Sequence, residues 1–71
     1  MANYYVINKN WTLNPGFHHE VHTRQHAIQL GVANAIDLGW CLTEQEAVRK
    51  GKSYYADADG CAICCPNVHK G

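Results

Sequence analysis

The chain ends in Cys61-Ala62-Ile63-Cys64-Cys65-Pro66-Asn67-Val68-His69-Lys70-Gly71, which holds three of its four cysteines and one of its five histidines. Two cysteines separated by two residues can bind one soft metal ion from a tight turn, and a nearby imidazole can add a third ligand. The remaining histidines also lie close together, at His18, His19, His22 and His26. We therefore predict a metal site that joins the middle of the fold to its C-terminal end.

The chain has 71 residues, which fits a single domain spanning residues 1–71. A hydrophobic core of this size rarely contributes more than about 3–5 kcal/mol, so a metal, a disulfide or a partner chain is expected to add stability. Hydrophobic residues make up 46% of the sequence and charged residues 17%, a composition that argues against disorder.

Basic and acidic residues are balanced at six each, so the formal net charge is zero. Without a basic field, the chain is not expected to bind nucleic acid or an anionic membrane. A near-zero charge also weakens repulsion between copies, which leaves a homodimer open alongside an unknown protein partner.

The N-terminal stretch Met1–Asn8 lacks the charged lead and long apolar run of a secretory signal. No segment approaches the ~20 apolar residues that a membrane span needs. For a full-length chain these features predict a cytoplasmic location, where thiols are mostly reduced. Reducing conditions favour a metal site or free thiols over disulfides in the cysteine cluster.

Three segments have the pattern of β-strands: residues 4–8, residues 17–23 and residues 36–42. Asn14-Pro15-Gly16 predicts a turn between the first two, which should form a hairpin with a long loop. Alternation in the second strand places Phe17, His19, Val21 and Thr23 on one face and His18, Glu20 and His22 on the other. In the third strand, strict alternation places Ile36, Leu38, Trp40 and Leu42 on a shared face.

A helix is predicted to begin after Thr43, because Thr43-Glu44-Gln45-Glu46 has the form of a capping box. Apolar residues recur at helical spacing as far as Tyr55, and residues 57–60 end the helix. Gly51 lies in the apolar stripe, and we expect it to let the helix approach the sheet closely. Residues 24–34 are compatible with a short helix or a packed loop.

These elements predict an α+β fold, with a small three-stranded antiparallel sheet, one C-terminal helix and a cysteine-rich tail. The larger aromatic residues are predicted to lie in the core, namely Trp11, Trp40, Tyr54 and Tyr55.

A tetrahedral zinc site needs four nitrogen or sulfur ligands. Cys61 and Cys64 have the spacing of a zinc knuckle, and His69 is near enough in sequence to fold back. His22 is the predicted fourth ligand, because its strand face points away from Phe17 and Val21.

Other arrangements remain open at this point. His19 would share the ion with His22 only if the strand bulged or ended between them. His26 and Cys65 are reserve ligands, and the role of Cys41 is open. The cysteines could instead form a disulfide or remain reduced, although a bridge between the adjacent Cys64 and Cys65 would be strained.

The chain resembles a group of small bacterial proteins of unknown function. The matching segments are Asn14-Pro15-Gly16, His19-Glu20-Val21-His22, Leu38-Gly39, Glu46-Ala47-Val48 and Asp59-Gly60-Cys61 with Cys64 and then His69. The chain departs from the group at Val68, His26 and Glu44, where the group tends to have cysteine. The resemblance implies no activity. The departures from the group disfavour a disulfide scaffold and leave His19, His22, Cys61, Cys64 and His69 as candidate ligands.

The predicted function is a small non-enzymatic binding module, stabilised by zinc bound to Cys61, Cys64, His69 and His22. The alternative is a thiol-based redox or metal-handling protein that uses Cys61, Cys64 and Cys65. An enzyme is the least favoured class, because nothing in the sequence predicts a substrate pocket.

Overall fold

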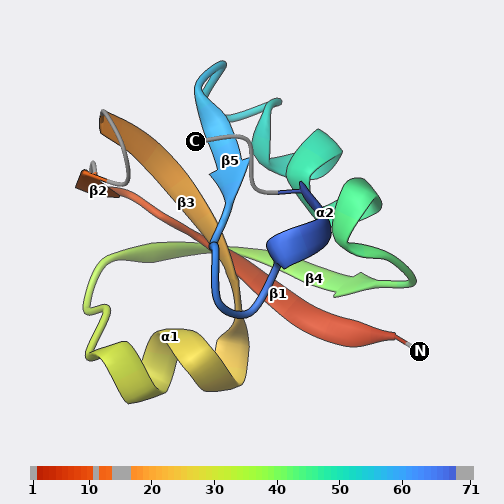
Figure 1. Cartoon of the computed structure of the whole chain (residues 1–71), viewed down its shortest axis with the longest axis horizontal. Helices are drawn as coiled ribbons and strands as arrows, with labels where there is room; N and C mark the ends of the chain where they lie inside the picture. The colour runs from red at the N-terminus through yellow and green to blue at the C-terminus, as the bar shows by residue number, and fades with distance from the viewer. Residues whose placement is uncertain (1, 11, 14–16, 69–71) are drawn as a thin grey trace.

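The computed structural model describes residues 2–10, 12–13 and 17–68, which form a mixed sheet with helices on both sides (Figure 1). The elements are β1 (Asn3–Asn8), β2 (Thr12–Leu13), β3 (Phe17–Thr23), α1 (Arg24–Leu30), β4 (Ala35–Cys41), α2 (Glu44–Gly51), β5 (Ala58–Gly60) and the short 3-10 helix η1 (Pro66–Val68). The predicted α+β class is confirmed. The predicted turn at residues 14–16 and the predicted core position of Trp11 lie outside the described residues.

Strand β3 lies at the centre of the sheet. Its residue Val21 pairs with Ile7 of β1 on one edge and with Gly60 of β5 on the other. Strand β4 pairs antiparallel with β1, so the four main strands have the order β4-β1-β3-β5, and β2 pairs with the first residues of β3. The three predicted antiparallel strands are present as β1, β3 and β4, but the prediction omitted the short parallel strand β5 and the two-residue antiparallel strand β2.

Helix α2 begins where the capping box predicts. The Thr43 hydroxyl accepts a hydrogen bond from the Glu46 amide at 3.1 Å. The Glu46 carboxylate accepts from the Leu42 amide at 2.7 Å, one residue earlier than a capping box requires. The helix ends at Gly51, well before the predicted end near Tyr55, and turns follow.

Gly51 sits directly against the sheet, as the sequence predicts. A Cβ atom at this position would lie 3.1 Å from Ile7 Cδ1 and 3.1 Å from Val21 Cγ2. Because α2 approaches the sheet so closely, it covers the apolar core. The buried residues of this core are Tyr5, Ile7, Val21, Leu38, Cys41, Ala47, Ala58, Cys65 and Val68.

A β-bulge in β4 overturns the predicted alternation of that strand. Tyr5 pairs with Gly39 and Val6 pairs with Asp37, so Leu38 is an extra residue, and Gly39 has a φ of 83°. Beyond the bulge the side chains change face, which places Cys41 in the core with Leu38 and leaves Trp40 69% exposed.

The predicted core positions of Trp40 and Tyr54 were therefore wrong, since Tyr54 is also exposed. Tyr54 follows the helix in a turn, so the helical periodicity that predicted its burial no longer applies. Tyr55 is half-buried and packs against the core.

The ambiguous segment after β3 forms a second helix, which the prediction of one helix omitted. Thr23 caps α1 by accepting from the His26 amide at 3.3 Å, and Gly31 ends it in the left-handed conformation. Helix α1 covers the face of the sheet opposite α2 (Figure 1). No helix among the described residues is long and apolar enough to cross a membrane.

We expect Gly51→Val to lower the free energy of unfolding by about 1–3 kcal/mol, because the new side chain would clash with Ile7 and Val21. Urea denaturation measures this change. The matched control is Arg49→Val, which places the same side chain on the exposed part of α2. Equal effects of the two substitutions would contradict the close helix–sheet contact.

Candidate metal centre

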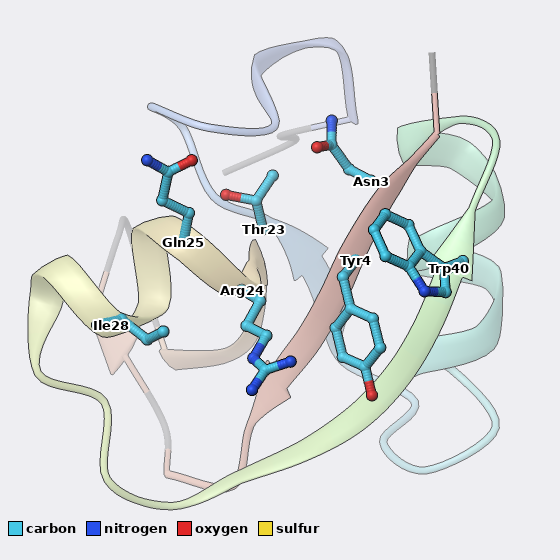
Figure 2. A pocket seen from close by; sticks show the side chains of 7 residues that line it. All are labelled: Asn3, Tyr4, Thr23, Arg24, Gln25, Ile28 and Trp40. Carbon is cyan, nitrogen blue, oxygen red and sulfur yellow. The ribbon is translucent and has the colours of Figure 1, made fainter.

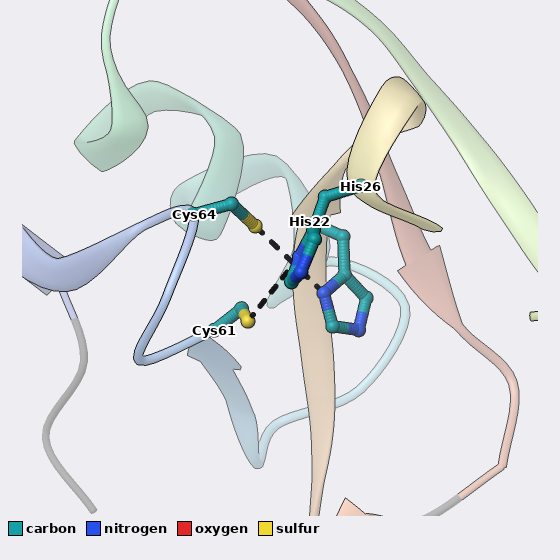
Figure 3. Close-up of side chains that lie close together, drawn as sticks. All are labelled: His22, His26, Cys61 and Cys64. Carbon is teal, nitrogen blue, oxygen red and sulfur yellow. Dashed lines mark hydrogen bonds between the residues drawn. The ribbon is translucent and has the colours of Figure 1, made fainter. Parts of the chain in front are cut away.

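Four side chains from separate parts of the chain converge beside the end of β3 (Figure 3). They are His22, His26, Cys61 and Cys64, and their ligand atoms all lie within 4.8 Å of one another. The Cys61 sulfur is 3.7 Å from His26 Nδ1, and the Cys64 sulfur is 3.8 Å from His22 Nδ1. Zinc bonds of about 2.0–2.3 Å place neighbouring tetrahedral ligands about 3.3–3.8 Å apart, so this group can hold a metal ion.

The junction between β3 and α1 brings the two histidines together. His22 lies near the end of the strand and His26 in the first turn of the helix. The Thr23 cap lets the backbone change from strand to helix between them, so their ring centroids are 5.6 Å apart at an angle of 64°. A continuous strand would hold the two imidazole rings apart. A continuous helix would bring the rings together but would remove His22 from the strand that pairs with β5 beside the cysteines.

Strand β5 brings the cysteines to the histidines. Its parallel pairing with β3 places Gly60 beside Val21, and the Cys61 amide extends the pairing by donating to the Val21 carbonyl at 3.0 Å. Cys61 is therefore held next to His22. Gly60 is required at this point, because a Cβ atom would lie 2.3 Å from Val68 Cγ2 and 2.9 Å from the Cys65 carbonyl oxygen.

Residues 61–65 form a tight turn around the Cys61 sulfur. The Cys65 amide donates to the Cys61 carbonyl at 2.9 Å, which closes the turn. The amides of Cys64 and Ile63 donate to the Cys61 sulfur, and such bonds stabilise a thiolate. This is the arrangement that the spacing of Cys61 and Cys64 predicts for a metal knuckle.

The two cysteine ligands differ in acidity. A hydrogen bond from the Cys65 thiol, at 3.8 Å, together with the His22 ring and the Thr23 amide, lowers the pKa of Cys64 to about 3 against the opposing effect of burial. The same contact with Cys64, together with burial, raises the pKa of Cys65. Burial raises the pKa of Cys61, although the two backbone amides partly offset it.

A buried carboxylate lies behind the site. Glu20 Oε1 is 3.7 Å from His22 Nε2, and both side chains are almost inaccessible to solvent, with Glu20 4% and His22 1% exposed. A carboxylate beside the outer nitrogen of a metal-binding histidine fixes the orientation of its ring. Glu20 therefore favours the orientation in which Nδ1 faces Cys64.

The structure brings together three of the four predicted ligands: His22, Cys61 and Cys64. The fourth, His69, lies outside the described residues. His26, predicted only as a reserve, joins the cluster. The signal that could have identified His26 is Thr23, a helix-capping residue placed between two histidines four positions apart.

The other sequence candidates lie elsewhere. His19 is on the α2 face of the sheet, where its ring stacks on Tyr55 at 3.7 Å and its Nδ1 is 2.6 Å from Asp57 Oδ1. Cys65 and Cys41 are buried in the apolar core, outside the cluster of His22, His26, Cys61 and Cys64.

Comparison of the chain with protein-family models, curated proteins and solved structures finds no match. The functional argument therefore depends on the geometry and chemistry of this site.

In the metal-free protein, held at a temperature where circular dichroism shows it folded, we expect iodoacetamide to modify Cys64 selectively. Because the pKa of Cys64 lies at about 3, its thiolate is fully formed, and the rate should change little between about pH 5 and pH 8. Peptide mass spectrometry identifies the modified cysteine.

Two comparisons make this test decisive. The unfolded chain in denaturant should show ordinary thiol titration at every cysteine. A Cys64 rate in the folded protein that rises about tenfold with each pH unit through this range would contradict the lowered pKa.

Proposed function

We propose that this protein is a small binding module whose structure is stabilised by one zinc ion bound to His22, His26, Cys61 and Cys64. The convergence of two sulfur and two nitrogen atoms within 4.8 Å carries the proposal. Zinc is favoured because it accepts tetrahedral sites of two thiolates and two imidazoles, whereas magnesium and calcium prefer oxygen ligands.

The ligand set favours a structural ion over a catalytic one. Four protein ligands fill the tetrahedral positions, and catalytic zinc sites keep one position for water or substrate. The ligands come from the β3–α1 junction and from the loop after β5, so the ion would connect two segments that lie far apart in sequence. In a chain of 71 residues such a connection supplies stability that a small core lacks.

The thiol chemistry of Cys64 supports a second candidate function, namely a thiol-based redox or metal-handling protein. Cys64 is half-buried, its pKa is lowered, and its sulfur is 3.8 Å from that of Cys65. The position of Cys65 opposes a redox function, because its side chain is fully buried in the core and adjacent cysteines form a strained disulfide. The structural zinc module is therefore preferred.

Removal of zinc should strongly destabilise the protein. A ligand at about 1,000 times its dissociation constant adds about 4 kcal/mol, so chelation should lower the thermal midpoint by more than about 15 °C. Differential scanning calorimetry with and without a chelator measures the shift, and elemental analysis should find one zinc ion per chain. An unchanged midpoint in a zinc-loaded sample would contradict a structural ion.

Single substitutions distinguish the proposed ligand set, His22, His26, Cys61 and Cys64, from the set predicted from sequence. His26→Ala and Cys61→Ser should abolish tight zinc binding, whereas His69→Ala and the control His18→Ala should retain it. Cobalt substitution provides the readout, because tetrahedral sulfur and nitrogen ligands give intense visible and near-ultraviolet absorption bands. Loss of these bands in His69→Ala, with His26→Ala unaffected, would restore the sequence-based ligand set.

Glu20→Gln should weaken zinc binding by about 10–100-fold, because the neutral amide no longer supports the His22 ring electrostatically. Competition with a chromophoric chelator measures the affinity. Asp37→Asn is the control, since it removes an exposed carboxylate from another strand. Equal zinc affinity in the wild-type and Glu20→Gln proteins would mean that Glu20 does not act on the metal site.

A further inference from the structure

An open groove of about 560 Å³ lies between α1 and the β1–β4 pair, beside the metal centre and separate from it (Figure 2). Its walls include Asn3, Tyr4, Arg24, Gln25, Ile28 and Trp40. Ile28 and Trp40 are 68% and 69% exposed, so two large apolar side chains face solvent on either side of the groove. A groove of this size can accommodate a short peptide segment.

The two aromatic rings in the groove are held at right angles. The ring centroids of Tyr4 and Trp40 are 5.6 Å apart, with an interplanar angle of 89°. The β4 bulge is responsible for this pair, because it turns Trp40 away from the core and toward Tyr4. The two rings contact each other edge to face, and the indole of Trp40 keeps an exposed surface on which a compact apolar ring can pack.

Among the described residues that line the groove the only charge is positive, and several of the polar groups can donate hydrogen bonds. The indole of Trp40, the amides of Asn3 and Gln25, and the guanidinium of Arg24 can all donate. No carboxylate lines the groove, and within the described part of the chain no acidic side chain forms an ion pair with Arg24. The groove is therefore complementary to a ligand that presents carbonyl oxygens and a negative charge.

We propose that this groove binds a proline-rich peptide in the polyproline II conformation that carries an acidic residue. Such a peptide has no internal hydrogen bonds, so its carbonyl groups are free to accept from the donors of the groove. Its pyrrolidine rings fit aromatic slots, and little conformational entropy is lost on binding. The acidic side chain pairs with Arg24 through a charge-assisted hydrogen bond.

The same observations disfavour nucleic acid as the ligand. Binding to single strands depends on several cations along the backbone and on free aromatic faces for base stacking. The groove has one cation, and the Arg24 guanidinium carbon lies 5.2 Å from the Tyr4 ring centroid, over its face.

The metal centre is expected to control the shape of the groove. Thr23, Arg24 and Gln25 line the groove and lie between the ligands His22 and His26. An ion bound to both histidines would fix the start of α1 against the sheet. This dependence on metal rests on the proposed zinc function, whereas the peptide site itself does not.

The test uses the zinc-loaded chain of 71 residues and fluorescein-labelled ten-residue peptides, with fluorescence anisotropy as the readout. The probe alternates proline pairs with single apolar residues and carries one glutamate at its start, middle or end. The comparison ligands replace the prolines by alanine, replace the glutamate by glutamine, or substitute a single-stranded RNA of ten nucleotides. We expect saturable binding that requires the prolines and weakens about three- to tenfold without the glutamate.

Substitutions in the groove locate the binding. Trp40→Ala should weaken binding by about tenfold or more, because exposed tryptophans are frequent hot spots. Arg24→Gln should weaken binding to the glutamate peptide and remove its advantage over the glutamine peptide, as a double-mutant cycle requires for a direct pair. Tyr54→Ala is the control, since it removes an exposed aromatic side chain from the turn after α2, outside the groove and the metal centre.

The zinc content and the thermal midpoint of each variant show whether it is folded. If Trp40→Ala does not fold, Ile28→Ser tests the opposite wall of the groove. Binding unchanged by Trp40→Ala and Ile28→Ser would overturn the proposal. So would tighter binding to RNA or to the alanine peptide, or no binding at millimolar concentrations to any proline-rich peptide. If a chelator leaves the peptide affinity unchanged, that result contradicts only the proposed dependence of the groove on zinc and not the peptide site itself.

Discussion

The parallel pairing of β5 with β3 is the constraint on which the candidate site depends. Only three residues form β5, yet the pairing of Gly60 with Val21 and the hydrogen bond from the Cys61 amide fix where the final loop begins. Once Cys61 is held there, the turn that places Cys64 follows from local backbone hydrogen bonds. The site therefore combines one long-range contact with two local structures, the strand–helix junction and the cysteine turn.

The sheet separates two environments that stabilise the protein differently. On one face α2 packs through Gly51 against Ile7 and Val21, and apolar contact is sufficient. On the other face α1 has seven residues and only Ala27 is buried within it. A helix this short is marginal on its own and buries little apolar area, so its position depends on polar contacts at its first turn. The proposed zinc ion would act at this weak point.

Local patterns in the sequence predicted those strands and helices whose conformation is favoured by their own residues. The β-branched and aromatic runs at β1, β3 and β4 and the cap at Thr43 are examples. The sequence could not predict β5, because Ala58, Asp59 and Gly60 have little strand propensity and are ordered by their partner. It also missed the bulge, since strict alternation of Ile36, Leu38 and Trp40 is also what a regular strand would show. His26 was predicted only as a reserve ligand for a related reason, because its contribution depends on where the strand becomes a helix.

The β4 bulge and the β3–α1 junction form opposite walls of the same groove. Gly39 permits the bulge that exposes Trp40 beside Tyr4, so the indole adds little buried apolar area to the core. Across the groove, Arg24 and Gln25 are positioned by the junction that also positions His22 and His26. An exposed tryptophan is an arrangement that the burial of apolar surface does not favour, and Arg24 on the facing wall adds a positive charge beside it. Their occurrence on facing walls is better explained by a ligand than by the stability of the fold.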